Sequence, residues 1–326
     1  MGLFHRRQFL HLARGAAALA GLSGPAGAQS YPTRPVHVIA GFPAGGPIDF
    51  GARIASEILS ERLAQNFLVE NHPGAAGNLA VEMVIRLPAD GYTLLAVGPP
   101  AAINATLYQN LEFNFLKDLA PVAGVYSVPY VMEVTPSLPA RTVREFIDYA
   151  KTNPGKINFS SSGNGSGQHI AGEMFRVMTG VDIVHVPYRG TPDALVDLMA
   201  GRVQMMIDPI SSSIEHIRAG KLRALAVASL TRSEALPELP TVNDFVPGFE
   251  MTAWYGICAP SKTPADIVNR LNEEINAGLG KIAMKKRIAD LGAGSLIGPP
   301  AEFGKRIAND TEKWGDVIRT AHITAA

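Results

Sequence analysis

Four polar or glycine-rich loops carry the residues that could bind or transform a small molecule. The first is FPAGGPID at residues 42–49, between a predicted strand at 36–42 and a predicted helix at 48–65. Its paired glycines let backbone N–H groups approach a ligand closely, and the helix N-terminus adds partial positive charge. That chemistry suits a carboxylate. The same glycines also suit a tight strand-to-helix turn that binds nothing.

The other three loops follow predicted strands in the same way. Residues 160–169, SSSGNGSGQH, offer several side-chain hydrogen-bond donors, and we favour a binding role over a plain linker. Residues 188–192, YRGTP, combine an arginine with Thr191 and Pro192, which also suit the start of a helix. Residues 208–213, DPISSS, begin with Asp208, which could simply cap the next helix.

Several kinds of chemistry lack their usual motifs. No Gly-Lys pair is followed by Ser or Thr as in a phosphate loop, the run at 163–167 lacks the third glycine of a dinucleotide fingerprint, and no serine has a G-x-S-x-G frame. The histidines after residue 28 show no metal-ligand spacing, and the single cysteine, Cys258, excludes an intramolecular disulfide. We expect no cofactor and no metal. An exported serine hydrolase using the 160–166 loop remains an alternative, although His169 is poorly placed as its base.

Strands and amphipathic helices alternate along the chain, which predicts an α/β protein with parallel sheets covered on both faces. Strands are predicted at 36–42, 93–98, 156–160, 182–187, 202–207 and 222–229, with an extended stretch at 119–134 broken by Pro129. Thr142 and Thr263 are predicted to begin helices. In such sheets ligands bind beyond the carboxyl ends of the strands, where the four loops lie.

The N-terminus has the pattern of an export signal. Arg6 and Arg7 precede a short apolar run, and Ala26-Gly27-Ala28 forms an A-x-A cleavage pattern, so we expect a twin-arginine type signal peptide at 1–28 and a periplasmic protein. Without the three arginines of this segment, 26 basic residues face 29 acidic ones, a net charge of −3. This balance argues against nucleic acid as a partner. No later stretch is long and apolar enough for stable membrane insertion, and we expect a monomer.

At these loops the chain resembles the substrate receptors of tripartite tricarboxylate transporters, the Bug or TctC-like proteins. The resemblance runs through most of the chain after the signal. It is carried by FPAGGPIDFGAR at 42–53, NHPGAAGN at 71–78, SSSGNGSGQHIAGEMF at 160–175, VPYRGTPDALVDLMAGRV at 186–203, IRAGKLRALAVAS at 217–229, LPELPTV at 236–242 and WYGICAPSKTP at 254–264.

The resemblance implies a type II periplasmic binding protein fold, with two lobes, a central sheet flanked by helices in each, and two crossings between them. Lobe one would comprise residues 30–127 and 250–326, and lobe two residues 128–249. Both would close by hinge motion on a small carboxylate, and the closed form would be recognised by membrane subunits of the transporter. The implied ligand-binding residues are Phe42, Ala44, Gly45, Asp49, Ala101, Ala102, Ser162, Asn164, Ser166, His169, Arg189, Thr191 and Asp208.

The loop at 99–102 departs from the family pattern. It reads PPAA, where relatives often carry Ser, Thr or His. Because this loop would face the distal end of the ligand, we expect an aromatic or long-chain carboxylate rather than citrate. A ligand-sensing receptor that signals to a two-component kinase would fit the same sequence.

Overall fold

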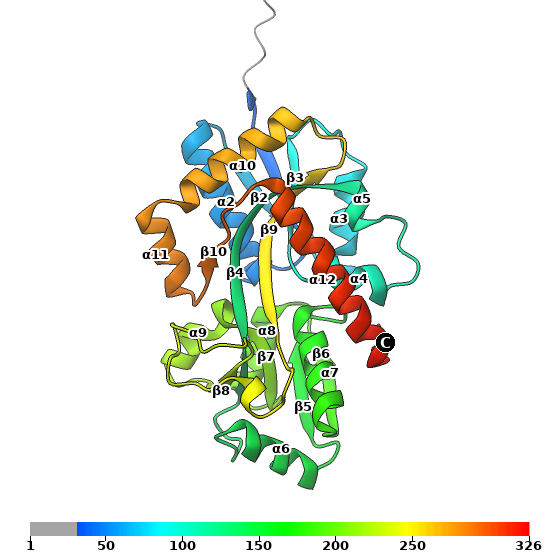
Figure 1. Cartoon of the computed structure of the whole chain (residues 1–326), viewed down its shortest axis with the longest axis vertical. Coiled ribbons are helices and arrows are strands. Elements are labelled where there is room, and N and C mark those ends of the chain that lie inside the picture. Colours follow the sequence, from blue (N-terminus) through cyan, green and yellow to red (C-terminus); the bar gives the residue numbers. More distant parts are fainter. Residues whose placement is uncertain (1–30, 326) are drawn as a thin grey trace, which may run out of the picture. The chain divides into compact units, whose positions relative to one another are not determined.

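The computed structural model describes residues 31–325 (Figure 1). Residues from Arg34 onward form one compact unit, and the predicted signal peptide lies outside the described residues. The strands are β1 (Val36–Ala40), β2 (Phe67–Asn71), β3 (Thr93–Val97), β4 (Leu119–Val134), β5 (Ile157–Ser161), β6 (Ile183–Pro187), β7 (Met205–Pro209), β8 (Arg223–Val227), β9 (Thr252–Pro260) and β10 (Gly294–Ser295). The α-helices are α2 (Pro47–Leu63), α3 (Asn78–Ile85), α4 (Pro100–Leu107), α5 (Phe115–Asp118), α6 (Val143–Thr152), α7 (Gly167–Thr179), α8 (Thr191–Met199), α9 (Ile210–Arg218), α10 (Ala265–Leu279), α11 (Ile282–Asp290) and α12 (Pro300–Thr320). Two short 3-10 turns, η1 (Ala75–Gly77) and η2 (Val242–Asp244), complete the described elements.

Two groups of parallel strands are joined by a pair of long antiparallel ones. The strand order is β2-β1-β3-β9-β4-β7-β5-β6, with β8 and β10 also paired to β4. Strands β1, β2 and β3 are parallel to one another, as are β5, β6 and β7, which confirms the α/β architecture expected from the sequence. Figure 1 shows β4 and β9 running side by side from one group toward the other. This arrangement forms two lobes, each around one group of parallel strands, which β4 and β9 connect.

Pro129 does not break β4, contrary to the prediction. The strand runs continuously from Leu119 to Val134. The reason lies in a change of partner: Pro129 is the last residue paired with β9, opposite Thr252, and Tyr130 is the first paired with β7, opposite Pro209. A residue without an N–H is tolerated where one ladder ends and another begins.

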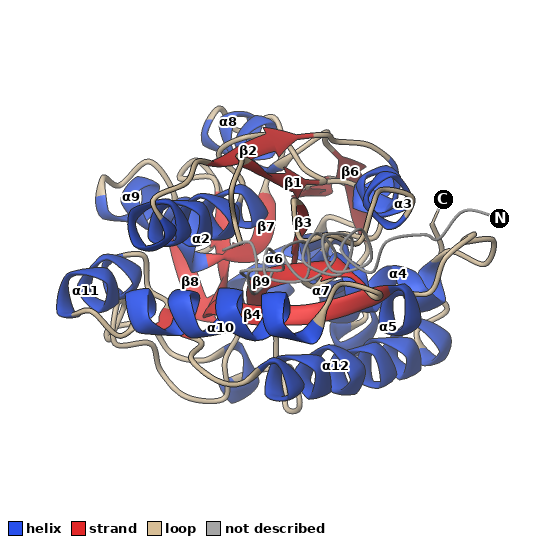
Figure 2. Cartoon of the chain, turned by 90° about the horizontal axis from the view of Figure 1, so that it is seen from above, coloured by secondary structure: helices blue, strands red, loops and turns tan. Residues whose placement is uncertain are grey.

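The helices begin close to where the sequence predicts, but two caps differ. Thr142 caps α6 by accepting a hydrogen bond from the Glu145 N–H at 3.1 Å. Thr263 does not cap α10, because its buried hydroxyl has no hydrogen-bond partner. Asp208 does not cap α9 either, since the N-cap residue is Pro209. Helices α10 and α12 lie beside β4 (Figure 2). Helix α2 packs against β2 and β9, and α8 packs against β5.

The hydrophobic core includes side chains of the long strands β4 and β9. Trp254, Tyr126 and Tyr130 are among the largest fully buried side chains, and all three lie on β4 or β9. The carboxyl ends of β1, β3, β5, β6 and β7 lead directly into α2, α4, α7, α8 and α9. Rigid strands therefore hold five helix N-terminal ends in fixed positions.

Candidate ligand-binding site

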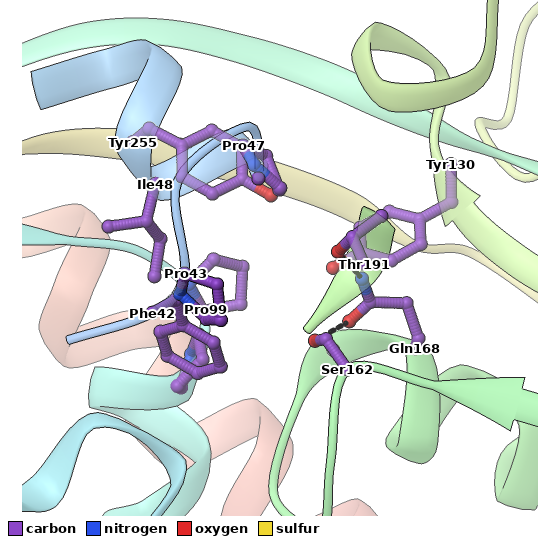
Figure 3. A pocket seen from close by; sticks show the side chains of 13 residues that line it. Phe42, Pro43, Pro47, Ile48, Pro99, Tyr130, Ser162, Gln168, Thr191 and Tyr255 are labelled. Atoms are coloured by element: carbon purple, nitrogen blue, oxygen red, sulfur yellow. Dashed lines mark hydrogen bonds between the residues drawn. The ribbon is translucent and has the colours of Figure 1, made fainter. Parts of the chain in front are cut away.

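An inner pocket of about 350 Å³ lies where both lobes meet (Figure 3). Its wall is formed by the starts of α2, α4, α7 and α8 and by single residues of β4 and β9. The lining residues are Phe42, Pro43, Gly46, Pro47, Ile48, Pro99, Pro100, Tyr130, Ser162, Gly167, Gln168, Thr191 and Tyr255.

The inner pocket has no charged side chain in its wall, yet its electrostatics favour an anion. The N–H groups in the first turn of a helix lack intrahelical partners, and the helix dipole places partial positive charge there. Helices α2, α7 and α8 present such ends to the pocket, whereas α4 begins with Pro99 and Pro100, which have no N–H to donate. A carboxylate can therefore be held by neutral donors alone. No charged side chain of the pocket has to lose its hydration when the ligand binds.

Gln168 connects the polar side of the pocket. Its Nε2 donates to the Thr191 Oγ1 at 3.1 Å and to the Asp208 Oδ1 at 2.9 Å. Its Oε1 accepts from the Ser162 Oγ at 3.0 Å. Three segments of lobe two, at the ends of β5, β6 and β7, are thus joined through one buried amide. Figure 3 shows Ser162, Gln168, Thr191 and Tyr130 on one side of the pocket and Phe42, Pro43, Ile48 and Pro99 facing them.

Asp49 organises the first loop from behind. Its Oδ2 accepts from the Gly45 N–H at 3.0 Å and from the Arg53 Nε at 2.8 Å, and its Oδ1 accepts from the Asn71 Nδ2 at 3.0 Å. Burial acts to raise the pKa of Asp49, but the hydrogen bonds from Arg53, Gly45 and Asn71 prevail and hold it below its ordinary value. Asn71 also donates to the Phe42 carbonyl at 2.9 Å, which fixes the start of the loop.

Three tyrosines lie on the crossing strands, and two of them, Tyr130 and Tyr255, line the inner pocket. The Tyr126 hydroxyl donates to the Pro47 carbonyl at 2.7 Å, and its ring lies 4.8 Å from that of Tyr255. Burial raises the pKa of Tyr130 and Tyr255 well above the ordinary value, so both hydroxyls are neutral donors. Gly167 is required here, because a Cβ at this position would overlap the Tyr130 hydroxyl.

An outer chamber of about 1120 Å³ adjoins the inner pocket and shares Phe42, Pro43 and Ser162 with it. The chamber is also lined by Asn164, Tyr188 and Arg189 and by the 73–77 turn. The lobes touch around it: the Tyr108 hydroxyl donates to the Asn164 carbonyl at 3.2 Å, and a Cβ at Gly190 would lie 2.8 Å from the Pro43 ring. These contacts describe two lobes closed upon each other.

The residues predicted from the sequence fall into three groups. Phe42, Ser162 and Thr191 line the inner pocket, and Asn164 and Arg189 line the outer chamber. Asp49, Ser166, His169 and Asp208 lie behind the wall, where they hold its loops. Ala44 and Gly45 are exposed at the rim, Ala101 lines neighbouring cavities in lobe one, and Ala102 is fully buried.

The supporting roles are explicit in the hydrogen bonds. Ser166 caps α7 by accepting from the His169 N–H at 3.3 Å. The His169 Nδ1 accepts from the Gly165 N–H at 3.3 Å, and its ring stacks on His185 at 4.3 Å. Burial lowers the pKa of His169, so the ring is a neutral acceptor.

Sequence reasoning named neither Tyr130 nor Tyr255 and mentioned Gln168 only as a possible donor. The tyrosines are single residues on long buried strands, and nothing in their local sequence distinguishes them from core. Pro47 and Ile48 lie in the candidate loop at 42–49, but they were not among the residues predicted to contact the ligand.

Among the residues that the structure describes, the loop serines are not arranged as an activated nucleophile beside the pocket. Ser162 donates to Gln168 and has no histidine beside it. Ser161 does contact the His185 Nε2 at 2.6 Å, but Ser161 is fully buried and lines neither chamber. Burial, with a smaller contribution from His169, lowers the pKa of His185 to about 3. Within residues 31–325 no cluster of His, Cys, Asp or Glu could hold a metal ion. In the same part of the chain, no helix has both the length and the apolar character of a membrane span.

Comparison with known proteins places the chain in a family. Residues 51–323 match the family model described as tripartite tricarboxylate transporter family receptor. The structure of R. palustris Rpa4515 with adipate is 35% identical, covers 90% of this chain and 99% of its own, and superposes with a TM-score of 0.88. The periplasmic binding protein BugD is 32% identical, with coverages of 90% and 99% and a TM-score of 0.86. MatC from Rhodopseudomonas palustris with bound malate is 30% identical, with coverages of 88% and 100% and a TM-score of 0.84.

The chain therefore belongs to the TctC or Bug family of tripartite tricarboxylate transporter receptors. These are periplasmic solute-binding proteins rather than enzymes. The family and fold inferred from the sequence motifs are confirmed.

Proposed function

We propose that this chain captures a small organic carboxylate between its lobes and delivers it to the membrane subunits of a tripartite tricarboxylate transporter. The observation that supports this most strongly is the uncharged inner pocket at which the N-terminal ends of α2, α7 and α8 converge. The carboxylates in the adipate and malate complexes of related receptors support the same ligand class. Export would precede capture, with the signal peptide cleaved after Ala28.

The proposed mechanism is closure of two lobes around β4 and β9. Lobe one would comprise residues 30–127 and 250–326, and lobe two residues 128–249. The change of partner at Pro129 and Tyr130 marks a natural hinge, because backbone pairing differs on its two sides. Closure would bring the α2 end of lobe one onto the α7 and α8 ends of lobe two. It would also exclude water, which strengthens the hydrogen bonds to the carboxylate.

The proposed ligand has an apolar part next to its carboxylate. Phe42, Ile48 and Pro99 lie on the side of the pocket opposite Gln168 (Figure 3), and none of their side chains can donate a hydrogen bond. This favours a dicarboxylate with a methylene chain or an aromatic acid over citrate, whose hydroxyl and third carboxylate would lose their hydration there.

The test is native mass spectrometry of the purified protein, followed by a thermal-shift panel of adipate, malate, benzoate and citrate. At a hundredfold excess over the dissociation constant, a bound acid should stabilise the protein by about 2.7 kcal/mol. Adipate or benzoate should shift the melting temperature more than citrate. A panel in which no carboxylate stabilises the protein would refute the proposal. Preference for citrate would refute the claim that the ligand has an apolar part.

Delivery to a sensor kinase ectodomain would use the same pocket. A pull-down with the ligand-loaded protein separates the two roles, because transport predicts capture of multi-span permease subunits. Retention of a kinase ectodomain alone would count against transport.

A further inference from the structure

A pair of buried acids lies directly behind Gln168. Asp208 is near the end of β7 and Glu133 is on β4, and each is 0% exposed. In the antiparallel ladder Asp208 is opposite Val131 and Glu133 is opposite Met206. Because alternate residues of a strand share a face, the two carboxyl groups lie on the same face of the sheet in diagonal positions.

No cation neutralises this pair. Within residues 31–325 neither carboxyl forms an ion pair with Lys, Arg or His, and three of the four oxygens have no hydrogen-bond partner: Glu133 Oε1, Glu133 Oε2 and Asp208 Oδ2. Two ionised carboxylates in such a position repel each other and lose their hydration.

The groups around the pair are neutral. Gln168 approaches from α7, serines of α9 from a second side, and the tyrosine hydroxyls of β4 and β9 from a third. The charged residues of α9 point elsewhere, since Glu215 and Arg218 are exposed and bonded to each other, and Arg223 of β8 binds backbone carbonyls at 136–140. Burial raises the pKa of Asp208 to about 7, and burial together with Asp208 raises that of Glu133 well above its usual range.

Asp208 in turn decides which way the Gln168 amide faces. An ionised carboxylate accepts hydrogen bonds but cannot donate them, so the Nε2 of Gln168 must point toward Asp208. The second Nε2 hydrogen is given to the Thr191 Oγ1, and Oε1 is left to accept from Ser162. An amide turned the other way would place its carbonyl against the carboxylate.

We infer that Asp208, with a protonated Glu133 near it, is a positioning residue that holds Gln168 so that Thr191 donates, and Ser162 accepts, a hydrogen bond in the ligand pocket. The Thr191 hydroxyl already accepts from Gln168 and donates to no group of the described chain, so its hydrogen is available to the pocket. The Ser162 hydrogen is used by Gln168, so only its lone pairs remain. A carboxylate oxygen would therefore bind on the Thr191 side.

The ligand in this inference rests on the proposed function. The protonation of Glu133 and the orientation of the Gln168 amide do not depend on it. The first test uses the ligand-free protein. Infrared spectra of the wild type should contain the carbonyl band of a protonated carboxylic acid at neutral pH, and Glu133→Gln, which mimics the protonated acid, should remove it. Absence of the band in the wild type, or its persistence unchanged in Glu133→Gln, would overturn the protonation of Glu133.

The second test observes the Gln168 side-chain amide by NMR with selectively labelled glutamine. Its hydrogens should exchange slowly in the wild type and in Glu133→Gln, and rapidly in Asp208→Leu, where the acceptor is gone. Asp208→Asn keeps an acceptor oxygen of the same shape and should restore protection. Equal protection in Asp208→Leu would overturn the positioning role.

The third test measures binding of adipate by calorimetry. Asp208→Leu should weaken binding at least about tenfold, and Asp208→Asn and Glu133→Gln should stay within about threefold of the wild type. Thr191→Val should weaken adipate binding about tenfold in the wild-type background. In the Asp208→Leu background it should weaken binding little further, because the two residues act through Gln168. Additive losses would overturn the inference. If adipate fails to bind while the two ligand-free results hold, the proposed ligand is wrong and the positioning role stands.

Discussion

The substitution Asp49→Asn tests whether one carboxylate holds the first binding loop. Asp49 is 2% exposed and accepts from Gly45, Asn71 and Arg53. Asparagine keeps the shape of the side chain but replaces one carboxylate oxygen with an NH2 group. That NH2 group then faces a hydrogen-bond donor, either Asn71 or the Gly45 N–H and Arg53. Hydrogen bonds to a charged group contribute about 1.5–3 kcal/mol each, so we expect unfolding free energy at neutral pH to fall by about 2–3 kcal/mol.

The stabilisation by Asp49 should depend on pH. The pKa of Asp49 is lowered in the folded protein, so its contribution is complete above the unfolded value of about 3.9 and is lost as the pH falls through the folded value. Urea unfolding of wild type and variant at about pH 7 should therefore show the full difference, which should shrink in acid. Asp316→Asn is the control, because Asp316 is 69% exposed in its pair with Arg319 and should cost no more than about 1 kcal/mol. Equal effects of the two substitutions at neutral pH, or a difference unchanged in acid, would refute this reasoning.

Three further predictions follow from the packing and the buried acids. Gly167→Ala should destabilise the protein by about 1–3 kcal/mol in urea unfolding, because the methyl group overlaps the Tyr130 hydroxyl, and Tyr130→Phe should recover part of the loss; no recovery would place the strain elsewhere. Gly190→Ala should hold Pro43 away, leave unfolding free energy near that of the wild type, and increase the radius of gyration seen by X-ray scattering; an unchanged radius with adipate present would contradict it. Glu133→Gln should gain stability relative to the wild type as the pH rises from about 5 to about 8, because the folded wild type keeps a carboxyl proton that the unfolded chain has already released, so its stability falls with pH until the folded state loses that proton too; denaturation curves with a constant difference would contradict it.

The positions of the binding loops were predictable because they depend on local signals. Glycines, serines and helix starts after apolar strands identify residues 42–49, 160–169 and 188–192, and parallel strands bring their carboxyl ends together. The α/β class followed from the same alternation. Family motifs then supplied the two-lobed fold, which local periodicity cannot define because it depends on where β4 and β9 pair.

The roles of individual side chains were less predictable. Asp49 and Asp208 are polar residues in candidate loops, yet both point behind the wall, where they bind the backbone or Gln168. Glu133 sits in an otherwise apolar strand with no loop signal, and its partner is 75 positions further along the chain at Asp208. Pro129 was read as a break because its missing N–H is visible in the sequence, whereas the change of strand partner that accommodates it is not.

The measurement that tests the central claim most directly is calorimetric titration of the purified protein with adipate and with its uncharged diamide. The two compounds share length and shape, and they differ in the negative charge that the helix N-terminal ends are proposed to hold. We predict saturable binding of adipate with one site and no measurable binding of the diamide. Equal binding of both, or binding of neither adipate nor any other carboxylate, would contradict the account.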